Sequence, residues 1–262
     1  MASELSPAAA LVRRHDPDRF LTALFAPAAR RETLFTLYAF NHELARAREV
    51  VTEPMLALMR LQWWREVVEG ADRRHDIATP LGAALDRGEL ERRDLLGLID
   101  ARETEAEPSI ATLADWRAYL LGSAGGLAVA AGRLLAAPDP EALRPLGAAY
   151  GAAGVLRSVP ALAAQRRCLL PIEVLARHGC SPEAAIAMPR SPPVLDTVRA
   201  LATEGRAMLA GVGSLGLPRH ARAAVLPAVL AARDLRRCSA PATPRRLGDR
   251  LAVVRAALTG AF

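Results

Sequence analysis

Apolar residues recur along the chain at intervals of three and four, and strict alternation of apolar and polar residues is almost absent. This pattern is typical of amphipathic helices. Capping residues divide it into segments: Asp16 followed by Pro17 favours a helix start, and Gly70 favours a helix end. The pattern predicts helices at 18–25, 28–51, 55–69, 80–87, 89–104, 111–136, 140–158, 168–178, 194–211, 218–235 and 244–259.

Short proline-rich connections separate these segments. They lie at 137–142, 188–193 and 239–244. The stretch 181–193 has the weakest helical pattern, and we expect a mobile surface loop there. The chain shows no repeat of fixed period and no long low-complexity linker. We therefore predict an all-α fold with one helical domain at 16–262, preceded by an N-terminal tail at 1–15.

The second predicted helix mixes apolar and polar residues. On a helical wheel Leu34, Leu37 and Leu44 form one apolar arc, and Asn41 and Arg48 fall inside that arc. A buried polar group without a partner costs about 1–3 kcal/mol. This helix is therefore expected to be central, with its polar residues lining a cavity or pairing with a neighbouring helix. A surface helix with its charged residues in water is the alternative.

The third predicted helix carries two adjacent tryptophans, Trp63 and Trp64. Neighbouring residues on a helix point about 100° apart, so both rings cannot enter one core in the same direction. We expect one ring to pack inside and the other to meet a ligand, a partner or a membrane edge. Alternatively, both tryptophans seal helix contacts at the core boundary.

Composition and charge narrow the possible functions. The 262 residues are 52% hydrophobic, which is enough for one sizeable core, and all 34 basic residues are arginine. The formal net charge is +6, but acidic residues are interspersed, which argues against a nucleic-acid-binding arm. An anionic membrane surface or a phosphorylated ligand stays possible. The three cysteines form no CxxC pair, which favours free thiols in a reducing compartment.

Membrane insertion and secretion are not expected. The first residues lack a basic segment followed by a long apolar run, and no apolar stretch approaches the ~18 residues that span a bilayer. We therefore predict a cytoplasmic protein, with peripheral attachment to the inner membrane as an open alternative.

Three segments together resemble a known family. They are AFNHELARARE at 39–49, LMRLQWWREVVEG at 58–70 and GVLRSVPALAAQRRCLLPIEVL at 154–175. The set resembles the squalene/phytoene synthase superfamily, and within it the branch of the mitochondrial complex I assembly factor and its alphaproteobacterial relatives. This resemblance implies an isoprenoid-synthase-like helical bundle around a central cavity.

Catalytic members of this superfamily condense two prenyl diphosphates and carry two DxxxD motifs. Their carboxylates hold the Mg²⁺ ions that neutralise the leaving diphosphate. The resemblance places the four aspartate positions at Ala45, Glu49, Ser158 and Leu162. Only Glu49 offers a carboxylate, and Pro160 should also break a helix within the second motif. The resemblance thus implies a pseudoenzyme with no catalytic residue, metal or cofactor. Mg²⁺ is needed only if the enzymatic alternative holds.

The remaining candidate residues are polar or cationic, and they lie on or near these motifs. Guanidinium groups bind phosphate oxygens without a metal. The candidates for the cavity or for anion binding are Asn41, His42, Arg46, Arg48, Arg60, Arg157, Arg166 and Arg167. A solvated turn is the alternative for the last two.

Other acidic residues do not rebuild the metal motifs. Asp72 and Asp76 follow the helix-ending glycine, so a solvated loop is expected there. Glu103, Glu105 and Glu107 are interpreted as the acidic end of an exposed helix.

Three functions therefore remain. The leading one is a non-catalytic protein that helps to assemble or stabilise a respiratory complex similar to complex I, through a protein partner and with no nucleic acid. The alternatives are an active Mg²⁺-dependent head-to-head prenyltransferase of isoprenoid biosynthesis, and a module that binds an isoprenoid or phospholipid.

Overall fold

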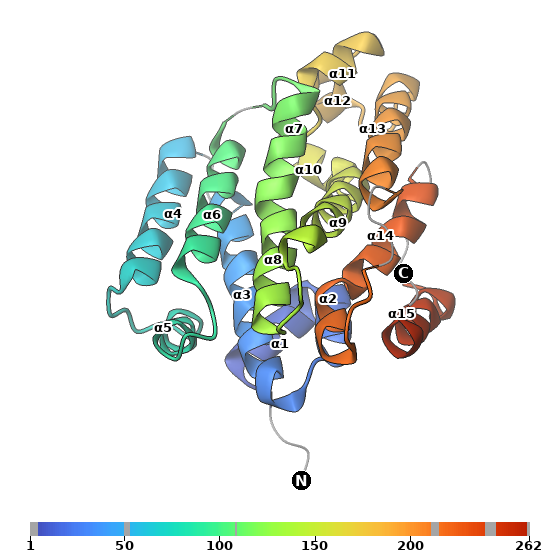
Figure 1. Ribbon diagram of the computed structural model, residues 1–262. Helices are drawn as coiled ribbons and strands as arrows, with labels where there is room; N and C mark the ends of the chain where they lie inside the picture. The colour runs from blue at the N-terminus through green and yellow to red at the C-terminus, as the bar shows by residue number, and fades with distance from the viewer. Residues whose placement is uncertain (1–4, 50–52, 108, 211–214, 239–244, 261–262) are drawn as a thin grey trace.

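The computed structural model describes residues 5–49, 53–107, 109–210, 215–238 and 245–260 (Figure 1). Within these ranges the chain forms helices and connecting segments and no strand. The helices before residue 104 are α1 (Pro7–His15), α2 (Pro17–Ala23), α3 (Ala28–Glu49), α4 (Pro54–Glu69), α5 (Ala78–Asp86) and α6 (Arg92–Glu103). The later α-helices are α7 (Leu113–Leu120), α8 (Gly126–Leu134), α9 (Arg144–Arg157), α10 (Val159–Ala164), α11 (Ile172–Arg177), α12 (Pro182–Ala187), α13 (Pro192–Ala210), α14 (Leu226–Arg236) and α15 (Leu247–Thr259).

Short helical turns join several of these elements. The 3₁₀ turns are η1 (Thr104–Ala106), η3 (Glu141–Leu143) and η4 (Arg219–Ala224), and a π turn, η2 (Leu121–Gly125), connects α7 to α8. The all-α prediction is confirmed, and α7, η2 and α8 together run through the segment predicted as one helix at 111–136.

The residues predicted to start or end helices do so in the structure. The Asp16 side chain accepts a hydrogen bond from the Arg19 backbone N–H at the start of α2. Gly70 ends α4 in the left-handed conformation, with φ of 114°. Pro160 separates the helices as predicted: α9 ends at Arg157, and α10 begins with this proline in its first turn.

Helix α3 is central, as predicted. Twelve of its residues are buried, including Asn41 and Glu43, and it packs against α1, α4, α5 and α8. Residue 51, which the sequence placed in this helix, lies outside the described residues. The surface-helix alternative is therefore wrong, because most of its sides are covered.

The second half of the chain packs around α9. Helix α9 contacts α13, α14 and the π turn η2, and small residues let the backbones approach closely. A Cβ added at Gly125 would lie 2.8 Å from the Arg144 carbonyl oxygen, and one at Gly151 would lie 2.7 Å from the Ala124 Cβ. The glycine-rich stretch at 122–132 therefore serves close helix packing.

Two sequence predictions are corrected by the packing. The N-terminal tail predicted at 1–15 is wrong for residues 7–15, because α1 buries Ala8, Ala9 and Val12 against the core that includes α3. The surface loop predicted at 181–193 is wrong for 182–187, which form α12. The Ser181 side chain caps that helix by accepting a hydrogen bond from the Ala184 N–H.

Candidate functional site

A buried polar network lies where the carboxyl end of α3 meets α6, η1 and α7. Glu105 is 6% exposed and accepts hydrogen bonds from Arg167 Nη2 and from the Tyr119 hydroxyl, both at 2.8 Å. Arg102 also donates to Glu105, and its Nη2 donates to Asn41 Oδ1 at 3.1 Å. We call these five residues the buried network.

The charges in the buried network are balanced by contact. Desolvation alone would raise the pKa of the Glu105 carboxyl, but Arg102 and Arg167 lower it below its ordinary value. Glu105 therefore stays ionised between two guanidinium groups. Its burial corrects the sequence interpretation of 103–107 as a wholly exposed acidic helix end, although Glu103 and Glu107 are exposed.

Glu49 stands at the end of α3 beside this network. Its residue is exposed, yet desolvation of the carboxyl and the charge of Glu105 raise its pKa above the ordinary value. The positive charges of Arg167, Arg102 and Arg46 oppose that rise. The charges that act most on Glu49 are thus one carboxylate and three guanidinium groups.

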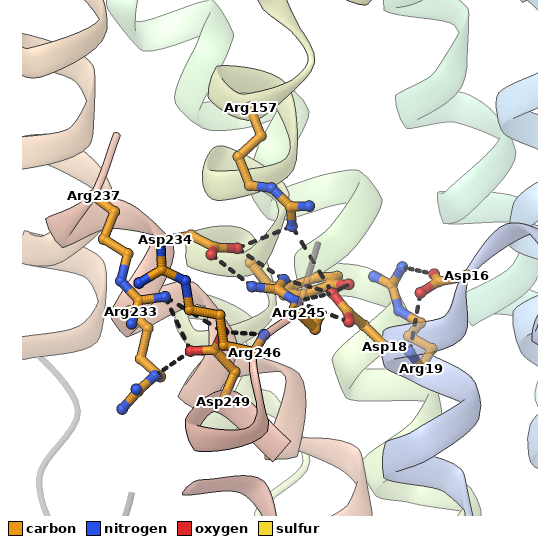
Figure 2. Close-up of polar contacts among 11 residues, drawn as sticks. Asp16, Asp18, Arg19, Arg157, Arg233, Asp234, Arg237, Arg245, Arg246 and Asp249 are labelled. Carbon is orange, nitrogen blue, oxygen red and sulfur yellow. Dashed lines mark hydrogen bonds and ion pairs between the residues drawn. The ribbon is translucent and has the colours of Figure 1, made fainter. Parts of the chain in front are cut away.

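A second group of charges joins the N-terminal helices to the C-terminal segment (Figure 2). Arg245 lies between Asp18 of α2 and Asp234 of α14, with nitrogen–oxygen distances from 2.5 to 3.0 Å to the first and of 2.6 and 2.8 Å to the second. Arg157 Nη1 donates to Asp234 Oδ2 at 3.0 Å, and the Tyr150 hydroxyl donates to Asp18 at 3.3 Å. We call these five residues the cleft network.

At the centre of the cleft network, the carboxylates of Asp18 and Asp234 both bond the guanidinium group of Arg245. Desolvation would lower the pKa of Arg245, but hydrogen bonds to Asp18 and Asp234 raise it above the ordinary value. The side chains of Arg245, Asp18 and Asp234 are 13%, 12% and 9% exposed. Arg245 therefore stays positively charged and is held in place by its two carboxylate partners.

The cleft network lines a surface cleft of about 1120 Å³. Asp16, Asp18 and Asp234 line it together with five arginines. These arginines are Arg13, Arg19, Arg157, Arg245 and Arg250. The cleft wall therefore carries an excess of positive charge, which favours anionic ligands.

One arginine that lines this cleft, Arg19, also contacts two tyrosine rings. The Arg19 guanidinium lies 4.7 Å from the Tyr150 ring centroid and 5.6 Å from that of Tyr38, and its Nη1 bonds Asp16 at 2.7 Å. Arg19 and Tyr150 also line a void between α2, α3, α9 and α14, and this void measures about 10 Å³. That is about the room of one water molecule, so the side chains are closely packed at this point.

The squalene/phytoene synthase family model matches residues 12–256, which is nearly the whole chain. The chain belongs to the squalene/phytoene synthase family. It is 28% identical over 202 residues to NADH dehydrogenase (ubiquinone) complex I, assembly factor 6 of Homo sapiens. It is 30% identical over 189 residues to the homolog of that factor in Drosophila melanogaster. The human match covers 74% of this chain and 61% of the human protein, so the chain spans about three fifths of that relative's length.

Solved structures show the same family fold. A dehydrosqualene synthase superposes with a TM-score of 0.78 at 14% identity, and the match covers 97% of this chain and 94% of that chain. A squalene synthase from Alicyclobacillus acidocaldarius superposes with a TM-score of 0.65 at 20% identity, covering 90% and 94%. The predicted isoprenoid-synthase-like fold is therefore confirmed. Among the described helices, none is long and apolar enough to cross a bilayer.

The squalene/phytoene synthase fold implies Mg²⁺, and the carboxylates of this site do not fit it. Mg²⁺ requires several oxygen ligands in near-octahedral geometry. In the cleft, both oxygens of Asp18 and of Asp234 are bonded to Arg245. Across the described ranges, no group of three or more His, Cys, Asp or Glu side chains is placed to hold a metal ion.

The four aspartate positions inferred from the family lie in different surroundings. Ala45 is half-buried and Glu49 is exposed on α3. Ser158 ends α9 and lines the cleft, whereas Leu162 packs into the apolar core formed with Trp116 and Leu156. Leu162 therefore faces apolar side chains rather than the cleft.

The candidate residues named from sequence divide among three places. Asn41 and Arg167 join the buried network, and Arg157 joins the cleft network. Arg60 is exposed and lines a surface groove of about 560 Å³ with Trp63 and Trp64. Trp64 is buried and Trp63 is half-buried, as predicted for a pair that divides between core and surface.

The other candidates make local contacts. Arg46 pairs with Glu43 on the same helix at 3.2 Å, and the His42 ring stacks on His15 with 4.5 Å between centroids. Arg48 is half-buried and is not without an interaction partner. Arg166 is exposed with φ of 57°, so the predicted solvated turn holds for Arg166 but not for buried Arg167.

Sequence reasoning missed the residues that organise the cleft. Asp18, Asp234 and Arg245 are far apart in the chain, and Arg245 and Asp18 are separated by 227 positions. The sequence carried one cue for Asp18, which lies in the first turn of a helix with a clear N-cap. It carried no local cue that Arg245 would reach it.

Proposed function

We propose that this chain is a non-catalytic squalene/phytoene synthase-like protein that assists the assembly or stabilisation of a respiratory complex similar to complex I. One observation carries the proposal: relatives named complex I assembly factor 6 align with 74% of the chain in Homo sapiens and 67% in Drosophila melanogaster. The partner would be a protein of that complex or of its assembly pathway.

The chemistry of the site supports a role without catalysis. Ionisation of a prenyl diphosphate needs divalent cations to stabilise the departing charge. At the inferred motif positions, Ala45, Ser158 and Leu162 have no carboxylate. Glu49 is the only one of the four with a carboxylate. It lies near three guanidinium groups, whose positive charge disfavours the binding of a metal ion. These features are expected of a metal site that has lost its ligands.

The interior also supports this proposal. Two prenyl chains need an extended apolar cavity, and the void lined by residues of α2, α3, α8, α9 and α14 has room for only about one water. The Arg19 guanidinium stands between that void and the cleft. A hydrocarbon chain entering from the cleft would have to displace a cation that bonds Asp16 and covers two tyrosine rings.

A deletion strain tests the assembly role. We expect complex I content and NADH oxidation to fall on deletion and to recover with the wild-type gene. A Glu49→Gln gene should complement equally well, because a non-catalytic role does not use that carboxylate. Normal complex I content in the deletion strain, with the loss of the protein verified, would contradict the proposal.

The second candidate is a Mg²⁺-dependent head-to-head prenyltransferase, with carboxylates recruited from other positions. The fold similarity to a dehydrosqualene synthase over 97% of the chain favours it. It requires Mg²⁺-dependent pyrophosphate release from prenyl diphosphates, which Glu49→Gln abolishes only if Glu49 is one of the metal ligands. The non-catalytic role predicts no such release.

A further inference from the structure

Helix α15 (Leu247–Thr259) lies at the periphery of the fold, beyond α14 (Figure 1). Its inner face contributes Val253 and Ala256 to a small apolar cluster with Leu226 and Leu230. Polar contacts hold both of its ends. Asp249 pairs with Arg233 and Arg237 (Figure 2). At the other end, Arg222 donates to carbonyl oxygens of the last turn.

The outer face of α15 carries a continuous apolar stripe in solvent. Leu247, Leu251, Val254 and Leu258 are 73%, 57%, 36% and 63% exposed. Their spacing of four, three and four residues places them within an arc of about 60° on a helical wheel. Scattered exposed leucines need no explanation, but four on one helix face form a surface that favours a partner.

Arginines border this stripe on both sides. Arg250 and Arg255 are exposed, and the wheel places them about 60–80° from Leu247 in opposite directions. Arg246 is also exposed. The one acidic residue of α15 is Asp249, which is 2% exposed and ion-paired on the inner face. The outer face therefore combines apolar and cationic side chains without a carboxylate.

We propose that the outer face of α15 docks on the surface of an anionic lipid bilayer. An amphipathic helix with an apolar stripe between arginines lies in the interface plane, with its leucines below the headgroups and its guanidinium groups on the phosphates. A second copy of the chain fits less well. A two-fold pairing through the stripe would bring Arg250 and Arg255 against the same cations of the other copy.

The docked orientation has a consequence for the cleft. Arg250 belongs both to the border of the stripe and to the lining of the cleft, and exposed Leu24 lines the cleft as well. Docking through α15 thus brings the mouth of the cationic cleft close to the lipid headgroups. This inference does not depend on the assembly role, because it concerns a surface outside both polar networks.

Vesicle sedimentation tests the proposal with the full chain. The probes are vesicles of phosphatidylcholine alone and of phosphatidylcholine with phosphatidylglycerol in equal parts. We expect binding to the anionic vesicles that weakens as salt is raised, and little binding to the neutral ones. The double variant Arg250→Glu, Leu251→Ser should lower the apparent partition coefficient by about tenfold or more.

A matched control changes one apolar residue and one arginine at another exposed site. Met188→Ser with Arg190→Glu alters the net charge equally and lies in the connection between α12 and α13. This control should bind vesicles as the wild type does, and circular dichroism should verify that both variants are folded. Two results would overturn the proposal: no wild-type binding to anionic vesicles, or equal losses in both variants. Self-association that the α15 variant abolishes, without vesicle binding, would instead assign the stripe to a second copy.

Discussion

The two polar networks of this protein both combine arginines, carboxylates and a tyrosine, but they differ in their access to solvent. In the buried network, Glu105 is 6% and Arg167 8% exposed at the side chain, and their partners enclose them. The cleft network has the opposite arrangement, one guanidinium between two carboxylates; it lines a cleft of about 1120 Å³, and Arg157 is 35% exposed. Glu105 and Arg167 are therefore less accessible to water than the cleft network, although Arg102 at the edge of the buried network is 14% exposed.

This difference separates a structural role from a binding role. Ions buried without water depend on each other, because an unpaired one has no alternative partner. Ions at a cleft can exchange a protein partner for water or for a ligand. We therefore assign the buried network to holding α3 against η1 and α7. The cleft network is the place where an anionic ligand can compete.

The largest expected effect comes from Glu105→Ala. This change leaves buried Arg167 and half-buried Arg102 without their carboxylate, and it should lower the free energy of unfolding by about 3–5 kcal/mol. Urea unfolding followed by circular dichroism measures it. The control Glu107→Ala, at an exposed neighbour, should stay within about 0.5 kcal/mol of wild type. A Glu105→Ala loss no larger than that of the control would mean that the network is not buried in solution.

Arg245→Ala should have a smaller effect. The freed Asp18 and Asp234 can turn to water in the cleft, so we expect a loss of about 1–3 kcal/mol in the free energy of unfolding. Arg250→Ala, at an exposed arginine of the same cleft, is the control and should change stability little. If Arg245→Ala cost as much as Glu105→Ala, the distinction between a closed and an open network would fail.

A pH titration probes the anchor of α15. Burial alone would raise the pKa of Asp249, but Arg233, the Arg246 N–H and Arg237 lower it to about 2, from an ordinary value of 3.8. Because the folded pKa is below the unfolded one, this stabilisation is complete above about pH 4 and is lost as the pH falls towards about 2. Asp249→Asn should therefore be less stable than wild type by about 2 kcal/mol near neutral pH, with the difference shrinking in acid.

Urea unfolding at several pH values measures this difference. Asp86→Asn, at a carboxylate that is 78% exposed, is the control and should show no such trend. A stability difference for Asp249→Asn that stays constant down to pH 2 would contradict the assigned ion pairs.

The smallest effect is expected at an exposed pair outside both networks. Arg199 pairs with Asp196 on α13, and their side chains are 53% and 46% exposed. Arg199→Ala should change the free energy of unfolding by no more than about 0.5 kcal/mol. A thermal unfolding scan measures it, and a loss above 1 kcal/mol would show that solvent exposure is a poor guide to the strength of pairs in this protein.

Much of the fold could be predicted because its signals are local. Asp16, Gly70 and Pro160 each mark a helix boundary through their own backbone or capping chemistry. Helix α12 carried a local signal too, since Ser181 followed by Pro182 is a good helix start, but the prolines around it suggested a loop. Helix α1 was missed because a single turn of Ala8, Ala9 and Val12 gives too short an apolar pattern.

The site could be predicted only in part because its contacts are long-range. Asn41 and Arg167 were identified as polar residues near the family motifs, and the structure joins them through Arg102 and Glu105. Nothing in the local sequence distinguishes buried Glu105 from exposed Glu103 and Glu107. The distinction depends on Arg167, which lies 62 positions away.

The most direct test of the non-catalytic proposal is pyrophosphate release from farnesyl diphosphate and geranylgeranyl diphosphate with Mg²⁺. Purified wild-type protein and its Glu49→Gln variant should be assayed beside an active squalene synthase as a positive control. We predict release no greater than in buffer for both proteins, because Asp18 and Asp234 are bonded to Arg245, and the described residues hold no group of three or more His, Cys, Asp or Glu side chains placed to bind a metal ion. Clear Mg²⁺-dependent release by the wild type would contradict this prediction, and its loss in the Glu49→Gln variant would assign Glu49 to the metal site.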